Sequence, residues 1–352
     1  MKKIGVMTFS KSLNYGAFLQ AYALQGVLRG MGVDVSLIDY ENPVDVKRYK
    51  LFQLKTLKST IGSLVFLPVM LKRKNNFRKA TKQLKYTPTN TKYDIAIAGS
   101  DQIWNPKLTG GELDEKFFLK GINADRKISY AASIANEEVI DERKREYKTH
   151  LEQLDYISVR ELSAKEKLSK YVDEPVFVAA DPVLLLTKKE WSDTIKDKTI
   201  NSRPYIFTYF VGGIKKNEAQ SLAKVCEKLN MDCVTYSKIP IERRIYRYAF
   251  ADGPLDFLAR LRDAKLVLTS SFHGVVLSII FHKNFYYFLP RADKRSRVDS
   301  ILNMLGLTDR IIETEDDIDK INLKDIDYTE PQKKLDKNRK ESLDWLKDKI
   351  KD

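Results

Sequence analysis

The stretch Ile4-Gly-Val-Met-Thr-Phe-Ser-Lys-Ser-Leu-Asn-Tyr-Gly16 opens the part of the sequence that decides the fold. Its first residues, Ile4 to Phe9, are a short β-rich run, and apolar residues then recur with helical spacing from about Ala17 to Gly30. A second short β-rich run covers Val33 to Asp39. A strand, a helix and a strand in this order predict a βαβ unit, in which helices cover a parallel sheet.

The same alternation continues to about Pro182 and begins again at Tyr205, after a polar stretch at 187–204. Two successive halves of this kind predict an α/β protein with two Rossmann-like domains that face a cleft. We expect the N-terminal domain at 1–190, the C-terminal domain at 203–312, and a helical tail at 313–352 that packs back on the opposite domain.

The net charge of +14 is concentrated in one segment. Residues 46–93 contain thirteen Lys or Arg residues and no Asp or Glu, and the apolar run 60–71 in their middle is too short to span a bilayer. An apolar stretch between basic clusters suits docking on an anionic membrane surface. A solvated basic helical hairpin that covers an edge of the core fits the pattern equally well. The segment has no interleaved aromatic residues or known binding motif, so it does not indicate nucleic acid.

No targeting or membrane-spanning segment is visible. The longest apolar runs are too short to cross a bilayer, and the N-terminus lacks the apolar core and cleavage site of a secretion signal. We therefore expect a cytoplasmic protein, peripheral on the inner face of the cytoplasmic membrane if the basic segment docks there. Cys226 and Cys233 form no metal-ligand or disulfide pattern and are expected to be buried or free thiols.

The three histidines differ in their surroundings. His150 lies in a charged helix and is expected to be exposed, and His282 follows the predicted apolar helix 275–281. His273 comes directly after the predicted strand 266–269, where a helix opens. Because open α/β sheets bind ligands at such strand ends, His273 is the leading candidate for chemistry.

The turn that carries this histidine reads Thr269-Ser-Ser-Phe-His-Gly274. Ser270 or Ser271 is placed to cap the helix, whose first N–H groups would then face the cleft. Gly274 is expected to let a ligand approach the backbone closely.

A second polar loop, Gly99-Ser-Asp-Gln-Ile-Trp-Asn-Pro106, follows a predicted buried strand. It brings together a hydroxyl, a carboxylate, amides and an indole, which is a suitable set for holding a sugar. Trp104 would stack on the ring, and Asp101 would accept hydroxyl protons. The alternative is a capped, ordered turn with Trp104 buried in the core.

Three other loops follow predicted strands. Residues 14–16 (Asn-Tyr-Gly) lie at the equivalent crevice of the first domain. Ser158-Val-Arg-Glu161 places Arg160 where it could hold a carboxylate or phosphate with two hydrogen bonds, or else form a salt bridge with Glu161. Arg291-Ala-Asp-Lys-Arg-Ser-Arg297 adds a cationic loop in the second half.

Taken together, these blocks resemble the polysaccharide pyruvyl transferase family. The matching segments occur in the family's order over roughly residues 1–310. There are six of them, and six segments in the same order are a specific indication of the family. They are Asn14-Tyr-Gly-Ala-Phe-Leu-Gln-Ala-Tyr-Ala-Leu24, Gly99-Ser-Asp-Gln-Ile-Trp-Asn-Pro106, Ser129-Tyr-Ala-Ala-Ser133, Ser158-Val-Arg-Glu161, Asp181-Pro-Val-Leu-Leu-Leu186 and Thr269-Ser-Ser-Phe-His-Gly274.

The resemblance implies a GT-B-like architecture, phosphoenolpyruvate as donor and a hexose as acceptor, in bacterial capsular or exopolysaccharide biosynthesis. Two hydroxyls of the sugar would add to C2 of the enolpyruvyl group to form a pyruvate ketal, and phosphate would leave. Phosphoenolpyruvate would be a co-substrate, and no metal or other cofactor is expected. If the basic segment docks on a membrane, a polyprenyl-diphosphate-linked sugar is the expected acceptor.

The resemblance also suggests roles for individual residues. His273 and Asp101 would take the catalytic roles, and Arg297-Val298 would match a Lys-Val pair of the family. Donor ligands would be Arg160, Ser271, His273, Gly274, Lys294 and Arg297, and acceptor ligands would be Asn14, Tyr15, Gly16, Ser100, Asp101, Gln102 and Trp104.

Two other functions are compatible with the same sequence. A GT-B glycosyltransferase that uses a nucleotide sugar would share the architecture. A non-catalytic, membrane-associated binding protein would depend on the basic segment 46–93 instead.

Overall fold

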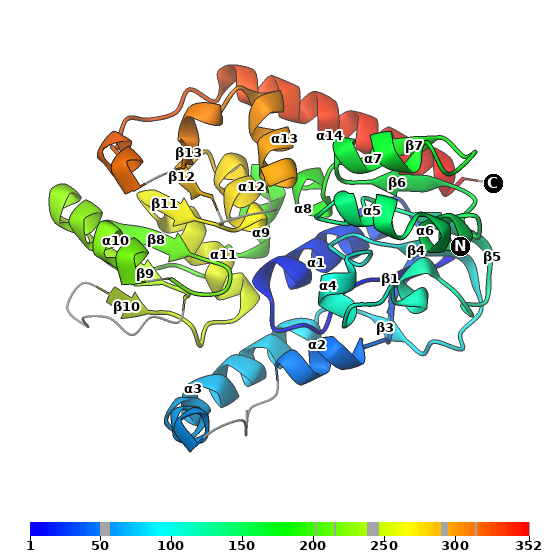
Figure 1. Cartoon of the computed structure of the whole chain (residues 1–352), viewed down its shortest axis with the longest axis horizontal. Helices are drawn as coiled ribbons and strands as arrows, with labels where there is room; N and C mark the ends of the chain where they lie inside the picture. The colour runs from blue at the N-terminus through cyan, green and yellow to red at the C-terminus, as the bar shows by residue number, and fades with distance from the viewer. Residues whose placement is uncertain are drawn as a thin grey trace. The chain divides into compact units, whose positions relative to one another are not determined.

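The computed structural model describes residues 1–49, 57–200, 203–214, 216–237, 246–289, 295–313 and 315–351. The chain forms two compact units, and neither is continuous in sequence (Figure 1). The first unit comprises Met1–Lys50, Thr81–Leu186 and Lys334–Asp352, and the second comprises Leu51–Ala80 and Thr187–Lys333.

The first unit is built on a five-stranded parallel sheet with the order β3-β2-β1-β4-β5. Its strands are β1 (Lys3–Met7), β2 (Asp34–Ile38), β3 (Tyr86–Thr87), β4 (Tyr93–Ala98) and β5 (Ala124–Ser129). The chain order reverses between β1 and β4, which pair in parallel with Met7 opposite Ala98. A two-stranded parallel sheet, β6 (Ile157–Val159) and β7 (Val176–Val178), is linked to the edge of β5 by an isolated bridge between Ile128 and Tyr156.

Helix α1 (Tyr15–Gly30) makes the predicted βαβ connection between β1 and β2. Asn14 caps it, because the Asn14 side chain accepts hydrogen bonds from the backbone N–H groups of Gly16 and Ala17. The other helical segments of this unit are α2 (Pro43–Arg48), α4 (Pro106–Thr109), η1 (Glu115–Phe118), α5 (Glu138–Glu142), α6 (Lys144–Leu151), α7 (Leu162–Leu168) and α8 (Pro182–Leu185).

The second unit contains a six-stranded parallel sheet with the order β10-β9-β8-β11-β12-β13. This order is that of dinucleotide-binding Rossmann sheets, and it reverses between β8 and β11. The strands are β8 (Tyr205–Tyr209), β9 (Asp232–Thr235), β10 (Tyr246–Tyr248), β11 (Leu266–Thr269), β12 (Asn284–Phe288) and β13 (Ile311–Ile312).

The helices of the second unit include one from the basic segment. This is α3 (Leu57–Thr81), which was expected within the N-terminal domain but is held against the turn before α11 in the second unit. The others are α9 (Lys188–Thr194), α10 (Lys216–Leu229), α11 (Pro254–Asp263), α12 (Phe272–Ile280), α13 (Arg295–Leu305), η2 (Thr308–Arg310) and η3 (Glu315–Lys320).

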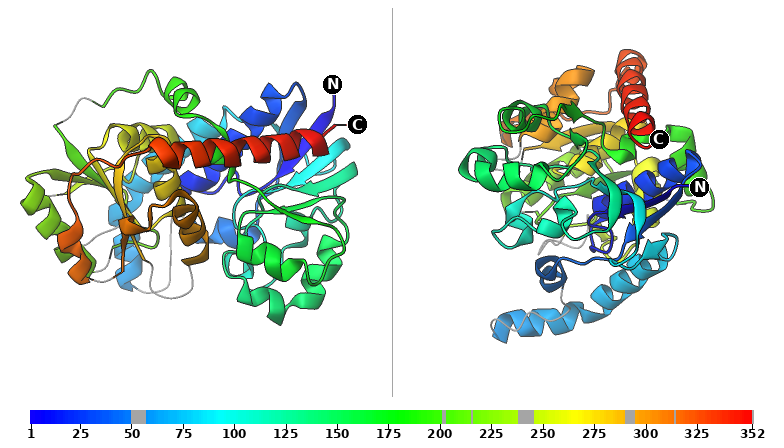
Figure 2. Two further views of the ribbon diagram at one scale, coloured as in Figure 1. Left: turned by 90° about the horizontal axis from the view of Figure 1, so that it is seen from above. Right: turned by 90° about the vertical axis from the view of Figure 1, so that its right-hand side faces the viewer.

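The C-terminal helix α14 (Thr329–Lys349) begins in the second unit and continues along the first. In the first unit, the hydroxyl of Ser342 accepts a hydrogen bond from the Ala180 N–H at 2.9 Å, and Trp345 stacks on Phe177 at 5.2 Å. Figure 2 shows the two ends of the chain beside each other, where Lys2 Nζ donates to the carbonyl of Ile350 at 3.0 Å.

The structure confirms an α/β fold with parallel sheets in both halves. Cys226 and Cys233 are buried free thiols, as expected. No helix in the described part of the chain combines the length and the apolar character that crossing a bilayer requires.

Candidate active site

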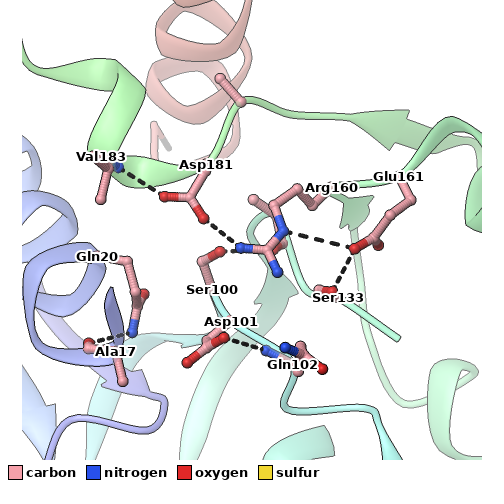
Figure 3. A network of polar contacts seen from close by, with 12 residues as sticks. Ala17, Gln20, Ser100, Asp101, Gln102, Ser133, Arg160, Glu161, Asp181 and Val183 are labelled. Carbon is pink, nitrogen blue, oxygen red and sulfur yellow. Dashed lines mark hydrogen bonds and ion pairs between the residues drawn. The ribbon is translucent and has the colours of Figure 1, made fainter. Parts of the chain in front are cut away.

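In the first unit, polar side chains gather where β1 and β4 end, at the reversal of strand order. The hydroxyl of Thr8 donates to the carbonyl of Ser100 at 2.8 Å, and Gln20 Nε2 donates to the Thr8 hydroxyl at 2.9 Å. The same Gln20 nitrogen donates to the carbonyl of Ala17 (Figure 3). These bonds hold the start of α1 against the loop after β4. The Gln20 amide oxygen is buried and has no hydrogen-bond partner among the described residues.

Asp101 lies at the centre of this loop in an unusual backbone conformation. Its φ of 73° is in the left-handed region, and so is the φ of 47° at Ala131 in the adjoining loop after β5. Such angles are uncommon outside glycine and tend to cluster at functional sites. The Asp101 Oδ1 accepts a hydrogen bond from the Gln102 N–H at 2.8 Å, and its carboxylate lies on the same side of the loop as the Gln20 amide (Figure 3).

Asp45, on α2, is a second acid near Asp101 that the sequence reasoning missed. Burial raises the pKa of the Asp45 carboxyl to about 6 against the opposing effect of Arg48, and the negative charge of Asp101 raises it further. The residue is the last acid before the acid-free segment, and nothing in its local sequence predicts that α2 brings it to this loop. A carboxyl with a pKa of about 6 suits proton transfer near neutral pH.

Arg160 is the cation of a buried network at the ends of β6 and β7 (Figure 3). Its Nη1 lies 2.5 Å from Asp181 Oδ2, and its Nε lies 3.6 Å from Glu161 Oε1. The Ser133 hydroxyl donates to Glu161, and Asp181 also accepts a hydrogen bond from the Val183 N–H at 3.0 Å. The two carboxylates outnumber the guanidinium, so this network has a net negative charge. The role of Arg160 as a donor ligand stays a prediction.

Trp104 does not take the predicted sugar-stacking role in this structure. It is fully buried, its Nε1 donates to the carbonyl of Phe117 at 3.0 Å, and its ring stacks on Phe118 at 5.0 Å. A side chain with no exposed face cannot stack on a ligand, so this part of the acceptor prediction is wrong. The alternative of a buried, ordered turn is the one that the structure shows.

The other predicted acceptor residues have mainly structural contacts. Tyr15 and Gly16 are buried in the first turn of α1, and the Ser100 hydroxyl donates to the carbonyl of Ala131 at 2.8 Å. Asn14 and Gln102 are half-buried and, like Asp101, lie at the carboxyl ends of β1 and β4. A ligand at this edge would therefore meet Asn14, Asp101 and Gln102 first.

In the second unit, the strand-to-helix turn after β11 has the predicted form. Ser271 is the N-cap of α12, and its hydroxyl accepts a hydrogen bond from the Gly274 N–H at 3.4 Å. Ser270 instead accepts a hydrogen bond from the Val211 N–H at 3.0 Å, which joins the ends of β8 and β11. Of the two serines that the sequence offered, Ser271 is the cap.

His273 is the second residue of α12, so the helix begins three residues earlier than the sequence indicated. Its side chain is largely buried, with the residue 8% exposed, and its ring packs edge-on against Phe272 at 5.4 Å. The first N–H groups of a helix lack intrahelical partners and carry a partial positive charge. The imidazole and these N–H groups therefore share one helix end, at the reversal of strand order between β8 and β11.

Gly274 serves packing, and the ligand approach that was expected at this residue stays a prediction. A Cβ at this position would lie 2.4 Å from Thr269 Oγ1 and 2.9 Å from Thr269 Cγ2. The Thr269 hydroxyl donates to the carbonyl of Tyr209 at 2.6 Å and accepts a hydrogen bond from the Ser271 N–H at 3.0 Å. Glycine lets α12 lie directly on this threonine, which holds the turn in shape.

The remaining candidates are not tested by the described residues. Lys294 lies outside them, and Arg297 lies in α13, where its side chain is not described.

The expectation that His150 is exposed is wrong: it stacks on Phe118 at 4.7 Å, and burial lowers its pKa. His282 follows α12, as predicted, and is exposed.

The structure thus places two candidate sites, each at the reversal of strand order in its own sheet. Asn14, Asp101 and Gln102 belong to the first unit, and Ser271 and His273 belong to the second. Within the described residues, no cluster of His, Cys, Asp or Glu side chains has a composition that could hold a metal ion. Open α/β sheets bind their ligands at such reversals.

Comparisons with known proteins identify the family and the fold. The sequence matches the family model described as polysaccharide pyruvyl transferase over residues 14–290. No match was found among curated protein sequences. The fold is similar to that of UDP-N-acetylglucosamine 2-epimerase from Rickettsia bellii, with 12% identity, a TM-score of 0.53 and 99% of each chain covered. It is also similar to UDP-GlcNAc 2-epimerase from Methanocaldococcus jannaschii, with 12% identity, a TM-score of 0.51 and 91% of each chain covered. At this identity the similarity concerns the fold, and it confirms the GT-B-like α/β class with two Rossmann-like domains.

Proposed function

Because the chain belongs to the polysaccharide pyruvyl transferase family, we propose that it transfers the enolpyruvyl group of phosphoenolpyruvate to two hydroxyls of a hexose. The product is a pyruvate ketal, and inorganic phosphate leaves. The acceptor in this proposal is a sugar of a bacterial capsular polysaccharide or exopolysaccharide, assembled on polyprenyl diphosphate. Phosphoenolpyruvate is a co-substrate, and the reaction uses no metal or other cofactor.

The reaction needs one proton donor and one proton acceptor. C3 of the enolpyruvyl group gains a proton. The oxygen of the first sugar hydroxyl forms a bond to C2, and this hydroxyl loses its proton. The second hydroxyl then forms a bond at C2 while the C2–O bond to phosphate breaks, and its proton leaves with the phosphate. No electrons are gained or lost overall, so the protein must supply acid–base groups and a site for the leaving phosphate.

The observation that carries the proposal is the position of His273 at the N-terminal end of α12. Phosphoenolpyruvate has a phosphate and a carboxylate, about three negative charges in total. A helix N-terminus with a capping serine attracts such charges, and the imidazole beside it adds a side chain that can donate a proton. In the proposed mechanism His273 is the acid that protonates C3, and the N–H groups at the start of α12 bind the phosphate.

The loop after β4 suits the acceptor better than the donor. The neighbouring network of Arg160, Asp181 and Glu161 has a net negative charge, and Asp101 and Asp45 add two further acids. These acids would repel an anionic donor, whereas carboxylates and amides are good partners for sugar hydroxyls. Asp101 is therefore the proposed base, and Asn14 and Gln102 are the proposed acceptor ligands.

A coupled assay of phosphate release tests the proposal directly. Wild-type protein is mixed with phosphoenolpyruvate and polyprenyl-diphosphate-linked saccharides, and the His273→Ala variant is compared with His282→Ala, which removes an exposed histidine of the same unit. Loss of general acid catalysis typically lowers kcat by about a hundredfold or more, so only the His273 variant should be strongly impaired. Equal activity of the two variants would remove His273 from the mechanism.

The alternative donor is a nucleotide sugar, since the fold is shared with structures named as UDP-GlcNAc 2-epimerases. Thermal unfolding with phosphoenolpyruvate, UDP-sugars and GDP-sugars separates the two functions. A true donor present at a hundred times its Kd stabilises the folded state by about 2.7 kcal/mol. Stabilisation by a nucleotide sugar and not by phosphoenolpyruvate would favour a glycosyltransferase.

A further inference from the structure

One side of helix α3 is buried near the C-terminus of the helix. Arg73, Phe77 and Ala80 are buried. Arg73 Nη1 donates to the carbonyl of Phe250 at 2.7 Å, and its guanidinium lies 4.3 Å from the Phe250 ring centre. These contacts fix the C-terminal half of the helix to the second unit.

Nearer the N-terminus of α3, the described residues leave the same side of the helix partly exposed at two positions. Val69 lies one helical turn before Arg73, and Phe66 lies two turns before it, so both are on the buried side of the helix. Nevertheless Phe66 is 54% exposed and Val69 is 36% exposed. Leu71, on another side of the helix, is 48% exposed. Phe66 and Val69 together expose large apolar side chains on one side of the helix, which is typical of an interaction site.

Cations surround this apolar patch. Lys72, Lys74, Arg78 and Lys79 are exposed on the sides of α3 that do not contact the second unit. No carboxylate among the described residues pairs with Lys72, Lys74 or Lys79, and the segment 46–93 contains no acid. The surface formed by Phe66, Val69 and these cations is called the α3 face below.

We propose that the α3 face docks the protein on an anionic lipid bilayer. Phe66 and Val69 enter the headgroup region, and the exposed lysines at the sides of the helix bind lipid phosphates. A second copy of the chain is a poor occupant, because it would bring the same positive charges together. Nucleic acid would use the lysines but has no need of exposed Phe66 and Val69.

The proposal depends on the contacts and charges of α3 and not on the proposed reaction. Its test therefore measures membrane binding without turnover. The docking proposal can fail while the proposed reaction holds, and the reverse is also true. If both hold, the protein works at the surface where a polyprenyl-linked acceptor is found.

Co-sedimentation of the full chain with vesicles tests the docking surface. Vesicles of phosphatidylcholine with one quarter phosphatidylglycerol are compared with pure phosphatidylcholine, at low and high salt. The charge variant is Lys72→Glu/Lys74→Glu/Lys79→Glu, which leaves buried Arg73 in place. Its matched control, Lys334→Glu/Lys337→Glu/Lys347→Glu, makes the same change of charge on exposed positions of α14.

We expect binding to anionic vesicles that weakens with salt, and a loss of affinity on the order of a hundredfold in the α3 charge variant. The α14 control should bind like the wild type. Phe66→Ser/Val69→Ser should also weaken binding, whereas Leu162→Ser, which alters an exposed leucine of the first unit, should not. Circular dichroism and thermal unfolding check that every variant is folded.

Several results would overturn the proposal. Wild-type protein that does not sediment with anionic vesicles at low salt has no such surface. Equal losses in the α3 and α14 charge variants would show a general charge effect. Tight binding to a DNA duplex that Phe66→Ser/Val69→Ser leaves unchanged, without vesicle binding, would assign the face to nucleic acid. Self-association that the same substitutions abolish would assign it to a second copy.

Discussion

Nη1 of Arg160 lies 2.5 Å from Oδ2 of Asp181, and the two side chains are 3% and 0% exposed. The pair joins the end of β6 to the start of α8, because Asp181 also caps α8 through the Val183 N–H. A buried ion pair is costly to break, since the remaining partner keeps its charge without compensation. The contact therefore supports the loops around the first candidate site.

Arg160→Met and Asp181→Asn should each lower the free energy of unfolding by about 3–5 kcal/mol. The double variant should cost clearly less than the sum, because each single change already breaks the same ion pair. Urea unfolding at neutral pH measures the free energy of unfolding of the two single variants and of the double variant. Lys189→Met, which breaks an exposed pair with Asp193, serves as the control and should change stability by less than about 1 kcal/mol. Additive losses from the two single changes would contradict the pairing.

Asp45→Asn should stabilise the protein at pH 7.5 and have little effect near pH 4. The pKa of this carboxyl is raised from 3.8 to about 6, mainly by burial, so the folded state disfavours its ionised form. The resulting penalty is absent below the unfolded pKa, grows as the pH rises, and is complete above the folded pKa. We expect a gain of about 2 kcal/mol at pH 7.5, after allowance for partial exposure.

Unfolding in urea at the two pH values measures this difference. Asp193→Asn, at an exposed position, is the control and should show no comparable dependence on pH. Destabilisation by Asp45→Asn at pH 7.5 would mean that ionised Asp45 has favourable contacts that outweigh its burial.

Gly274→Ala should destabilise the second unit by about 1–3 kcal/mol, because the new methyl group would overlap Thr269. Thr269→Ala in the same chain should recover part of this loss. Gly26→Ala is the matched control, since a Cβ there meets no atom within 4 Å and alanine favours a helix interior. Thermal unfolding compares the stability of these three variants with that of the wild type. A Gly274→Ala variant as stable as the wild type would disprove the close packing.

Trp104→Ala should cost about 3–5 kcal/mol of stability, as expected for a large buried ring. Trp104→Phe should cost less and, where the protein is folded, leave the KM for the sugar acceptor within about twofold, since the indole offers no face to a ligand. Steady-state kinetics on the Trp104→Phe variant measure this KM. A large rise in KM with unchanged stability would restore the predicted stacking role.

The sequence was sufficient to predict those features that depend on local patterns. Buried parallel strands appear as short apolar runs, so the βαβ unit at residues 4–39 and the strand 266–269 were found close to their observed positions. The candidate loops were found because they follow such strands. The sequence narrowed the cap of α12 to Ser270 or Ser271, because capping uses few residue types at a fixed place in the helix, and the structure selects Ser271.

Features that depend on distant contacts were not predictable. Trp104 is buried because Phe118 and the Phe117 carbonyl come from a later turn, and the same indole on an open loop would have the same local sequence. The need for glycine at 274 depends on the side chain of Thr269 beneath it. The assignment of α3 to the second unit depends on Phe250 and Ala251, about 175 positions along the chain.

The division of α14 between the two units has a consequence for protein synthesis. Ser342 and Trp345 contact the first unit, yet they come after the whole of the second unit in the chain. Domains commonly fold one after another as they leave the ribosome. Here the first unit lacks one of its packing surfaces until residues 334–352 have been translated, so its folding finishes after that of the second unit could begin. During that interval the Ala180 N–H lacks its partner Ser342, and the Phe177 ring lacks its stacking partner Trp345.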